Sequence, residues 1–152
     1  MDQAEQILSY AEQRCKSNGS HLTDKRKQVL SGLLQSQKAL SAYELVEVCK
    51  AEFDETMPAM SIYRILDFLQ KELLVHKLSL ANKYVACTHI TCDHEHAASQ
   101  FLIYSECQKV EEISISKATI AGLELTAKQA GFDHVSPQLE MNGVCNHCMA
   151  TM

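Results

Sequence analysis

The sequence has little of what would place it in several classes of protein. Its 152 residues include no tryptophan, 2 prolines and 5 glycines, which excludes collagen-like and low-complexity chains. No uncharged apolar run approaches the ~18 residues that a membrane-spanning helix needs, and the N-terminal residues do not predict a signal peptide. Hydrophobic residues make up 46% of the chain, enough to bury a core. The composition predicts a soluble cytoplasmic protein of one domain or two small ones, with no membrane partner.

Positive charge is also scarce. The chain has 14 Lys and Arg against 19 Asp and Glu, and residues 81–152 carry 4 basic against 8 acidic side chains. Net charge alone argues mildly against nucleic-acid binding, but phosphate contacts depend on local charge. The dense basic cluster is Lys25-Arg26-Lys27, at the start of a predicted helix. A bound phosphate or a solvated charged face would each account for it.

Cysteine and histidine, in contrast, are abundant, with 7 of each, and ten of these fourteen residues lie between positions 87 and 148. An odd cysteine count without a signal peptide argues against a secreted disulfide framework. The second half of the chain is therefore predicted to hold metal ligands, reactive thiols or small core residues.

Apolar residues at helical spacing predict four helices in the first half, which begin near residues 3, 23, 41 and 58. The clearest start is a capping box, Ser41-Ala42-Tyr43-Glu44, in which Ser41 is the N-cap and Glu44 the third helical residue. Pro58 suits the first turn of the last of these helices.

The pattern then changes, because Leu73–Leu78 and Lys83–Cys87 predict two short strands. Helices followed by such a hairpin are the winged form of the helix-turn-helix module. In that fold residues 58–70 form the recognition helix, and its exposed Tyr63 and Arg64 reach base edges or phosphates. A helical bundle that binds no nucleic acid fits the same pattern.

The second half is predicted to be a small α/β unit. Its expected elements are strands at Phe101–Tyr104 and Lys109–Ile113, a helix at 115–130 ended by Gly131, a strand from about Asp133 to Met141, and a turn at Asn142-Gly143. Such a unit has exposed sheet edges and little core of its own. Pairing with a second copy would cover the edges and enlarge the buried core.

Cys145-x-x-Cys148 is typical of half a tetrahedral zinc site, of a redox pair, or of chance. The expected second pair supplies one sulfur, from Cys107, because position 104 is a tyrosine. A further cluster, Cys92-Asp93-His94-Glu95-His96, is either a metal-binding loop or a solvated one.

Several stretches together carry a family pattern. They are Leu22-Thr23 through Val29-Leu30, Leu40 through Leu45, Ser61 through Leu69, Val75-His76-Lys77, Tyr84 through Cys87, and Gly131-Phe132 through Cys148. These stretches resemble the ferric uptake regulator family, and most closely its zinc uptake regulator branch. The resemblance implies an α+β protein with a winged helix-turn-helix DNA-binding domain at 1–80, a hinge at 81–88 and an α/β dimerisation and metal-binding domain at 89–152.

The resemblance also implies the roles of individual residues. It assigns a regulatory zinc site to His76, Cys87, His96 and Glu112, with His96 preferred to His94 and Glu112 to Glu111 because they keep the family's spacing. It assigns operator contacts to Tyr43 and Arg64. A structural zinc site would use Cys107, Cys145 and Cys148. That site lacks the family's usual cysteine at Tyr104, so its fourth ligand is Cys92, a histidine or water, or the site is weak or empty.

The sequence thus predicts a homodimeric zinc-responsive repressor of metal-uptake genes, with one regulatory zinc per chain and double-stranded operator DNA as its partner. A sensor of iron, manganese, nickel or peroxide in the same family is an alternative, as is a thiol redox protein using Cys145 and Cys148. Paired catalytic carboxylates, a nucleophile motif and a phosphate-binding glycine loop are not evident, so neither an enzyme nor a small-molecule substrate is expected.

Overall fold

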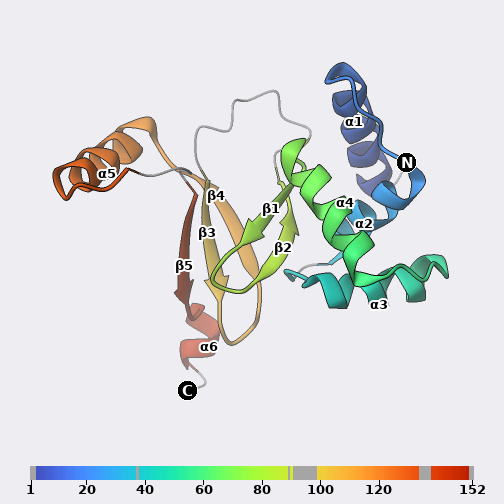
Figure 1. The fold of residues 1–152 in the computed structure, drawn as a ribbon. Coiled ribbons are helices and arrows are strands. Elements are labelled where there is room, and N and C mark those ends of the chain that lie inside the picture. The colour runs from blue at the N-terminus through green and yellow to red at the C-terminus, as the bar shows by residue number, and fades with distance from the viewer. Residues whose placement is uncertain (1–2, 37, 89, 91–98, 134–137, 151–152) are drawn as a thin grey trace. The chain divides into compact units, whose positions relative to one another are not determined.

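The computed structural model describes residues 3–36, 38–88, 90, 99–133 and 138–150. The chain divides into two compact units, Met1–Asp93 and His94–Met152. The first is mainly helical and the second is built on a small sheet (Figure 1), which confirms the predicted α+β class. Residues 81–88, predicted as a hinge, include a strand of the first unit. The functional roles assigned to 1–80, 81–88 and 89–152 stay predictions.

Four helices form the first unit where the apolar periodicity predicts them: α1 (Gln3–Ser17), α2 (Asp24–Gln35), α3 (Ala42–Phe53) and α4 (Ala59–Lys71). Thr23 caps α2 by accepting a hydrogen bond from the backbone N–H of Arg26 at 3.4 Å. Pro58 is the N-cap of α4 rather than a residue of its first turn. Its extended ψ of 151° sets the chain direction into the helix, and its carbonyl accepts the first helical hydrogen bonds.

The core of the first unit is centred on α2, which packs against α1, α3, α4 and the second strand of the hairpin. Leu30, Leu45 and Leu66 are fully buried in this core, and each buried leucine stabilises the fold by ~1.5–3 kcal/mol. Helices α2 and α3 approach closely at Gly32, where a Cβ would lie 3.1 Å from Val48 Cγ1. A residue with a Cβ there would require the Val48 side chain to shift by a few tenths of an ångström.

The hairpin pairs β1 (Val75–Leu78) with β2 (Lys83–Ala86) in antiparallel register, with His76 opposite Val85. Both strands are shorter than predicted: Leu73 lies before β1 in a left-handed conformation (φ 60°), and Cys87 follows β2. Helices followed by this hairpin form a winged helix, as the sequence predicts.

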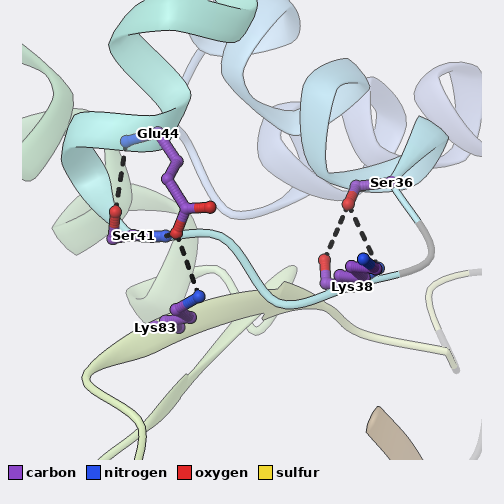
Figure 2. Close-up of polar contacts among 5 residues, drawn as sticks. All are labelled: Ser36, Lys38, Ser41, Glu44 and Lys83. Carbon is purple, nitrogen blue, oxygen red and sulfur yellow. Dashed lines mark hydrogen bonds and ion pairs between the residues drawn. The ribbon is translucent and has the colours of Figure 1, made fainter. Parts of the chain in front are cut away.

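The hairpin of β1 and β2, which is the wing of this fold, is attached to the start of α3 by backbone and side-chain bonds. Leu40 and Tyr84 exchange backbone hydrogen bonds of 3.0 and 2.8 Å. The capping box forms as predicted, and Lys83 Nζ on β2 lies 3.1 Å from Glu44 Oε1 (Figure 2). Ser36, also drawn in Figure 2, closes a separate local turn with Lys38. The N-terminus of α3 and the wing therefore form one connected structure.

In its described residues the second unit contains three strands and two helices: β3 (Ser99–Tyr104), β4 (Val110–Ser114), α5 (Lys117–Gln129), β5 (Leu139–Gly143) and α6 (Asn146–Ala150). Strand β3 is central, antiparallel to β4 and parallel to β5 (Figure 1). Gly131 has φ +81° just beyond α5, as expected of a residue that ends a helix.

One strand prediction is wrong at both ends. Strand β5 begins at Leu139 rather than near Asp133, and residues 134–137 lie outside the described residues. Asn142-Gly143, predicted as a turn, is instead the end of β5, because both residues pair with β3 and Gly143 O accepts a hydrogen bond from Ser105 N at 2.9 Å. Pairing with a neighbouring strand overrides the local turn preference.

The second unit buries few side chains. Phe101 is fully buried, whereas none of the residues of α5, all of which the structure describes, is buried. Leu123, Leu125 and Met141 are 47%, 60% and 55% exposed. In the described part of the chain, no helix has the length and apolar character needed to cross a membrane.

Candidate metal centres and nucleic-acid interface

Three cysteines come together at one end of the second unit's sheet. Cys107 lies in the turn after β3, and Cys145 and Cys148 follow β5. Because β3 and β5 are parallel neighbours, both strands end at the same edge of the sheet. The three sulfur atoms lie within 4.8 Å of one another, and those of Cys107 and Cys145 are 3.7 Å apart.

That separation matches a shared metal ion. Thiolates bound to zinc at ~2.3 Å in a tetrahedron lie ~3.8 Å from each other, whereas disulfide-bonded sulfurs are ~2.0 Å apart. The arrangement of Cys107, Cys145 and Cys148 therefore fits zinc, with the three side chains half-buried.

Hydrogen bonds within this cluster separate the pKa values of two of its thiols. The pKa of Cys145 is lowered, chiefly because the backbone N–H and the thiol of Cys148 donate to its sulfur; the backbone bond measures 3.4 Å. The pKa of Cys148 is raised to about 12, mainly because its thiol is the donor in that bond to Cys145. Cys145 is thus the thiol most easily ionised of the two, and a metal would displace the remaining protons.

A second group of donors lies at the base of the wing. His76 is half-buried on β1, and Cys87, immediately after β2, is 3% exposed. The Cys87 backbone N–H donates to Leu74 O at 2.9 Å, which holds the end of the hairpin closed. A ring nitrogen of His76 and the sulfur of Cys87 lie within 4.8 Å of each other. An imidazole beside a thiol is a donor pair that suits zinc.

Arg14 on α1 holds the chain on both sides of this hairpin. Its guanidinium donates to the carbonyl of Ile90 at 2.7 Å and, more weakly, to that of Leu73 at 3.4 Å. Sequence reasoning missed Arg14, since a contact across 76 positions leaves no local pattern. The carbonyls of Leu73 and Ile90, one before and one after the hairpin, are therefore both bound to the first helix.

Two acidic residues of β4 have different surroundings. Glu112 is half-buried and pairs in register with Phe101. Glu111 is exposed and accepts a hydrogen bond of 3.1 Å from the Tyr104 hydroxyl, which raises the pKa of that tyrosine. The preference for Glu112 over Glu111 as a ligand stays a prediction. His96, with Cys92 and His94, lies outside the described residues.

The three candidate DNA-binding residues differ in exposure. Tyr43, in the first turn of α3, is 68% exposed, and Arg64 on α4 is exposed as well. Tyr63, which the sequence predicts to be exposed, is instead half-buried and packs against the core. Met60, one turn before Arg64, is 65% exposed and was missed because exposed and buried methionines look alike in sequence. The outer face of α4 is therefore available to a partner.

Two cations of the basic cluster are engaged within the first unit. The Arg26 guanidinium lies 3.7 Å from the centre of the Phe68 ring and donates to His21 O at 2.6 Å. Lys27 pairs with Glu12 at 3.2 Å and lowers the pKa of that carboxyl. These contacts account for Arg26 and Lys27 without a phosphate.

Comparisons with known proteins agree with this architecture. The model of the ferric uptake regulator family matches residues 17–142. The zinc uptake regulation protein of Escherichia coli (strain K12) is 29% identical over 145 residues, covering 95% of this chain and 82% of that protein.

Two solved structures are similar over nearly the whole chain. A zinc uptake regulator complexed with zinc and DNA has a TM-score of 0.87 and 26% identity, covering 99% of this chain and 98% of that one. Holo XcZur has a TM-score of 0.79 and 31% identity, covering 95% and 98%. With a family model that spans most of its length, this chain belongs to the ferric uptake regulator family.

Proposed function

We propose that this protein is a cytoplasmic zinc-responsive repressor that binds operator DNA as a homodimer and controls zinc-uptake genes. The observation that carries the proposal is the pair of donors at the base of the wing, His76 and Cys87. The similarity to a zinc uptake regulator complexed with zinc and DNA supports it over 99% of the chain.

His76 and Cys87 would hold a regulatory zinc ion together with His96 and Glu112. The first two residues belong to the DNA-binding unit and the last two to the sheet unit, so a shared ion would restrict the motion of one unit relative to the other. Zinc supplies a cation that binds imidazole, thiolate and carboxylate at once. The thiolate favours zinc over iron or manganese.

That restriction would favour DNA binding. In a dimer, two recognition helices must reach major grooves that are ~34 Å apart or a multiple of that distance. A dimer whose units have fewer relative orientations before binding loses less entropy when it binds DNA. A coupling of ~1–3 kcal/mol between zinc and operator changes affinity by ~5–150-fold. Operator DNA would tighten zinc binding by the same factor.

The outer faces of α3 and α4 would contact the operator. Tyr43 and Arg64 are exposed there, and a bidentate arginine contact to guanine contributes ~1–3 kcal/mol of discrimination. Tyr63 is half-buried, and its hydroxyl would contact base edges or phosphates. The exposed apolar side chains of the second unit, Leu123, Leu125 and Met141, would be covered in the homodimer.

A second zinc ion would be held by Cys107, Cys145 and Cys148. The 3.7 Å separation of two of these sulfurs supports this site. It draws on the second unit alone, so it would stabilise that unit without linking it to the first.

The central test is operator binding with and without zinc. Affinity should fall on chelation and return with zinc, but not with manganese or iron at matched free concentration. Cys87→Ser should lose this response while remaining dimeric. Cys49→Ser, which changes another buried cysteine of the same unit, should keep it. Equal operator affinity with and without zinc would contradict the proposal.

A second test concerns the DNA surface. Arg64→Ala should weaken operator binding by ~5–150-fold, equivalent to ~1–3 kcal/mol, with zinc content unchanged. Lys50→Ala, which removes an exposed cation from the last turn of α3, is the matched control and should have a smaller effect. Unaltered operator affinity in Arg64→Ala would remove α4 from the proposed interface.

A further inference from the structure

Among the residues that the structure describes, the three-cysteine cluster is one donor short of a closed zinc site. Structural zinc sites in proteins are almost always tetrahedral with four protein ligands. Cys107, Cys145 and Cys148 supply three, and no other His, Cys, Asp or Glu of the described residues joins their group. His147, between the last two cysteines, is exposed and remains outside it.

The position that would supply a fourth thiolate is occupied by Tyr104. Cysteines paired on one metal are commonly separated by two residues, and Tyr104 stands at that spacing before Cys107. Its backbone is fixed in the turn, because its N–H donates to Lys109 O at 3.0 Å and its carbonyl accepts from Gln108 N at 2.8 Å. The turn thus has the shape that a cysteine pair uses, but one of its two side chains is a phenol.

The phenol of Tyr104 is directed to another partner. Its hydroxyl donates to Glu111 Oε2 at 3.1 Å on the adjacent strand. This bond uses the hydroxyl proton, which a phenol must lose to become the phenolate that binds zinc. Tyr104 therefore occupies the fourth position without serving as a ligand.

Solvent has access to this cluster. Each of the three cysteines is half-buried rather than buried, and Ser105 and Asn146 beside them are exposed. We propose that zinc bound by Cys107, Cys145 and Cys148 keeps an open fourth coordination position, which takes a small monodentate ligand from solution and makes this ion exchangeable. The inference rests on the proposed zinc site in the second unit.

Such a site differs in kind from a closed structural one. Three protein ligands with one exchangeable position are the arrangement of zinc centres that bind external ligands. Because three thiolates make the ion soft, the external ligand class that it prefers is a small thiol. Loss of one ligand also weakens retention of the metal, by more than the ~10–100-fold that follows from losing a single outer-shell partner.

Cobalt substitution tests the open position directly. Full-length dimer carrying Cys87→Ser, which removes the thiolate of the regulatory site, is loaded with Co²⁺, whose thiolate charge-transfer band reports the number of bound sulfurs. We expect a band of three-thiolate intensity that increases by about one third when 2-mercaptoethanol is added. The same protein with Tyr104→Cys should start at four-thiolate intensity and not respond. Zinc should leave the first protein more than ~10-fold faster than the second under a competing chelator.

The remaining outcomes are also informative. A four-thiolate band in the protein with Tyr104, lost in Cys92→Ser, would overturn the inference by identifying Cys92 as the fourth ligand. A three-thiolate band whose intensity does not change when thiol is added would overturn the inference as well. Absence of any thiolate band, with Tyr104 or with Tyr104→Cys, would instead contradict the proposed zinc site in the second unit.

Discussion

Replacing Ser41 by alanine removes the side-chain half of the capping box at the start of α3. Ser41 Oγ accepts from the Glu44 backbone N–H at 3.1 Å, and Glu44 Oε1 accepts from the Ser41 backbone N–H at 3.0 Å. The same carboxylate oxygen lies 3.1 Å from Lys83 Nζ (Figure 2). Without the hydroxyl, one N–H at the helix start has only water as a partner.

The expected loss is moderate. An N-cap serine replaced by alanine costs about 1 kcal/mol, within ~0.5–2 kcal/mol. For a unit of this size a change of 1 kcal/mol shifts Tm by ~4–8 °C. Glu44→Gln should cost less, because glutamine also serves in a capping box and the ion pair with Lys83 is exposed, worth ~0–1 kcal/mol.

The pH dependence of this contribution has a definite sign. The pKa of Glu44 is lowered in the folded protein, first because the Ser41 backbone N–H donates to its carboxylate. The stabilisation is therefore present above the ordinary glutamate pKa of ~4.3 and is lost as the pH falls through the lower folded value. Glu44→Gln should lose less stability than the unmodified protein over that acidic range.

Thermal unfolding by circular dichroism and amide hydrogen exchange of α3 measure both effects. Ser9→Ala, at an exposed position of α1, is the control and should change stability by less than ~0.5 kcal/mol. If the Ser41→Ala variant has the same Tm as the Ser9→Ala variant and its α3 amides keep their protection from exchange, the capping argument is refuted.

Three further predictions test the core, the wing and the second unit. Leu66→Ala should destabilise the first unit by ~2–5 kcal/mol in denaturant unfolding, because Leu66 is fully buried; Leu80→Ala, at an exposed position of the same unit, should cost far less, and equal losses would contradict this core. Arg14→Met should accelerate exchange of the Cys87 amide, which donates to Leu74 O, and weaken zinc binding by Cys87, since a hydrogen bond from a charged group contributes ~1.5–3 kcal/mol; unchanged exchange would show that the contact with the Ile90 carbonyl is dispensable. Cys148→Ser should lower zinc per chain by one in native mass spectrometry while zinc-dependent operator binding persists, and an undiminished count would exclude Cys148 as a ligand.

Local sequence determined most of the first unit. The starts of α2 and α3 follow from a threonine cap and a capping box, whose partners lie three residues apart, so the side chains that form them are adjacent in the chain. The apolar spacing of α4 likewise predicts a stripe of Ile62, Ile65, Leu66 and Leu69; Ile65 is partly buried and the other three are buried. These features need no knowledge of the rest of the fold.

The candidate sites were predictable only in part. The Cys145-x-x-Cys148 spacing indicated a metal half-site, but its proximity to Cys107 depends on the parallel pairing of β3 with β5. That pairing also turned Asn142-Gly143 from an expected turn into a strand end. Likewise, sequence alone left Arg26 open to phosphate binding, whereas in the folded unit it stacks on Phe68.

There is a physical reason why the sequence predicted some of these features and not others. Caps, helix periodicity and Cys-x-x-Cys spacing depend on groups within about one helical turn of each other, and a sequence displays those groups directly. The register of β5 and the contact of Arg14 with Ile90 O join residues far apart in the chain. Those contacts form only when packing of the whole unit repays the entropy of closing long loops, so tertiary structure alone decided them.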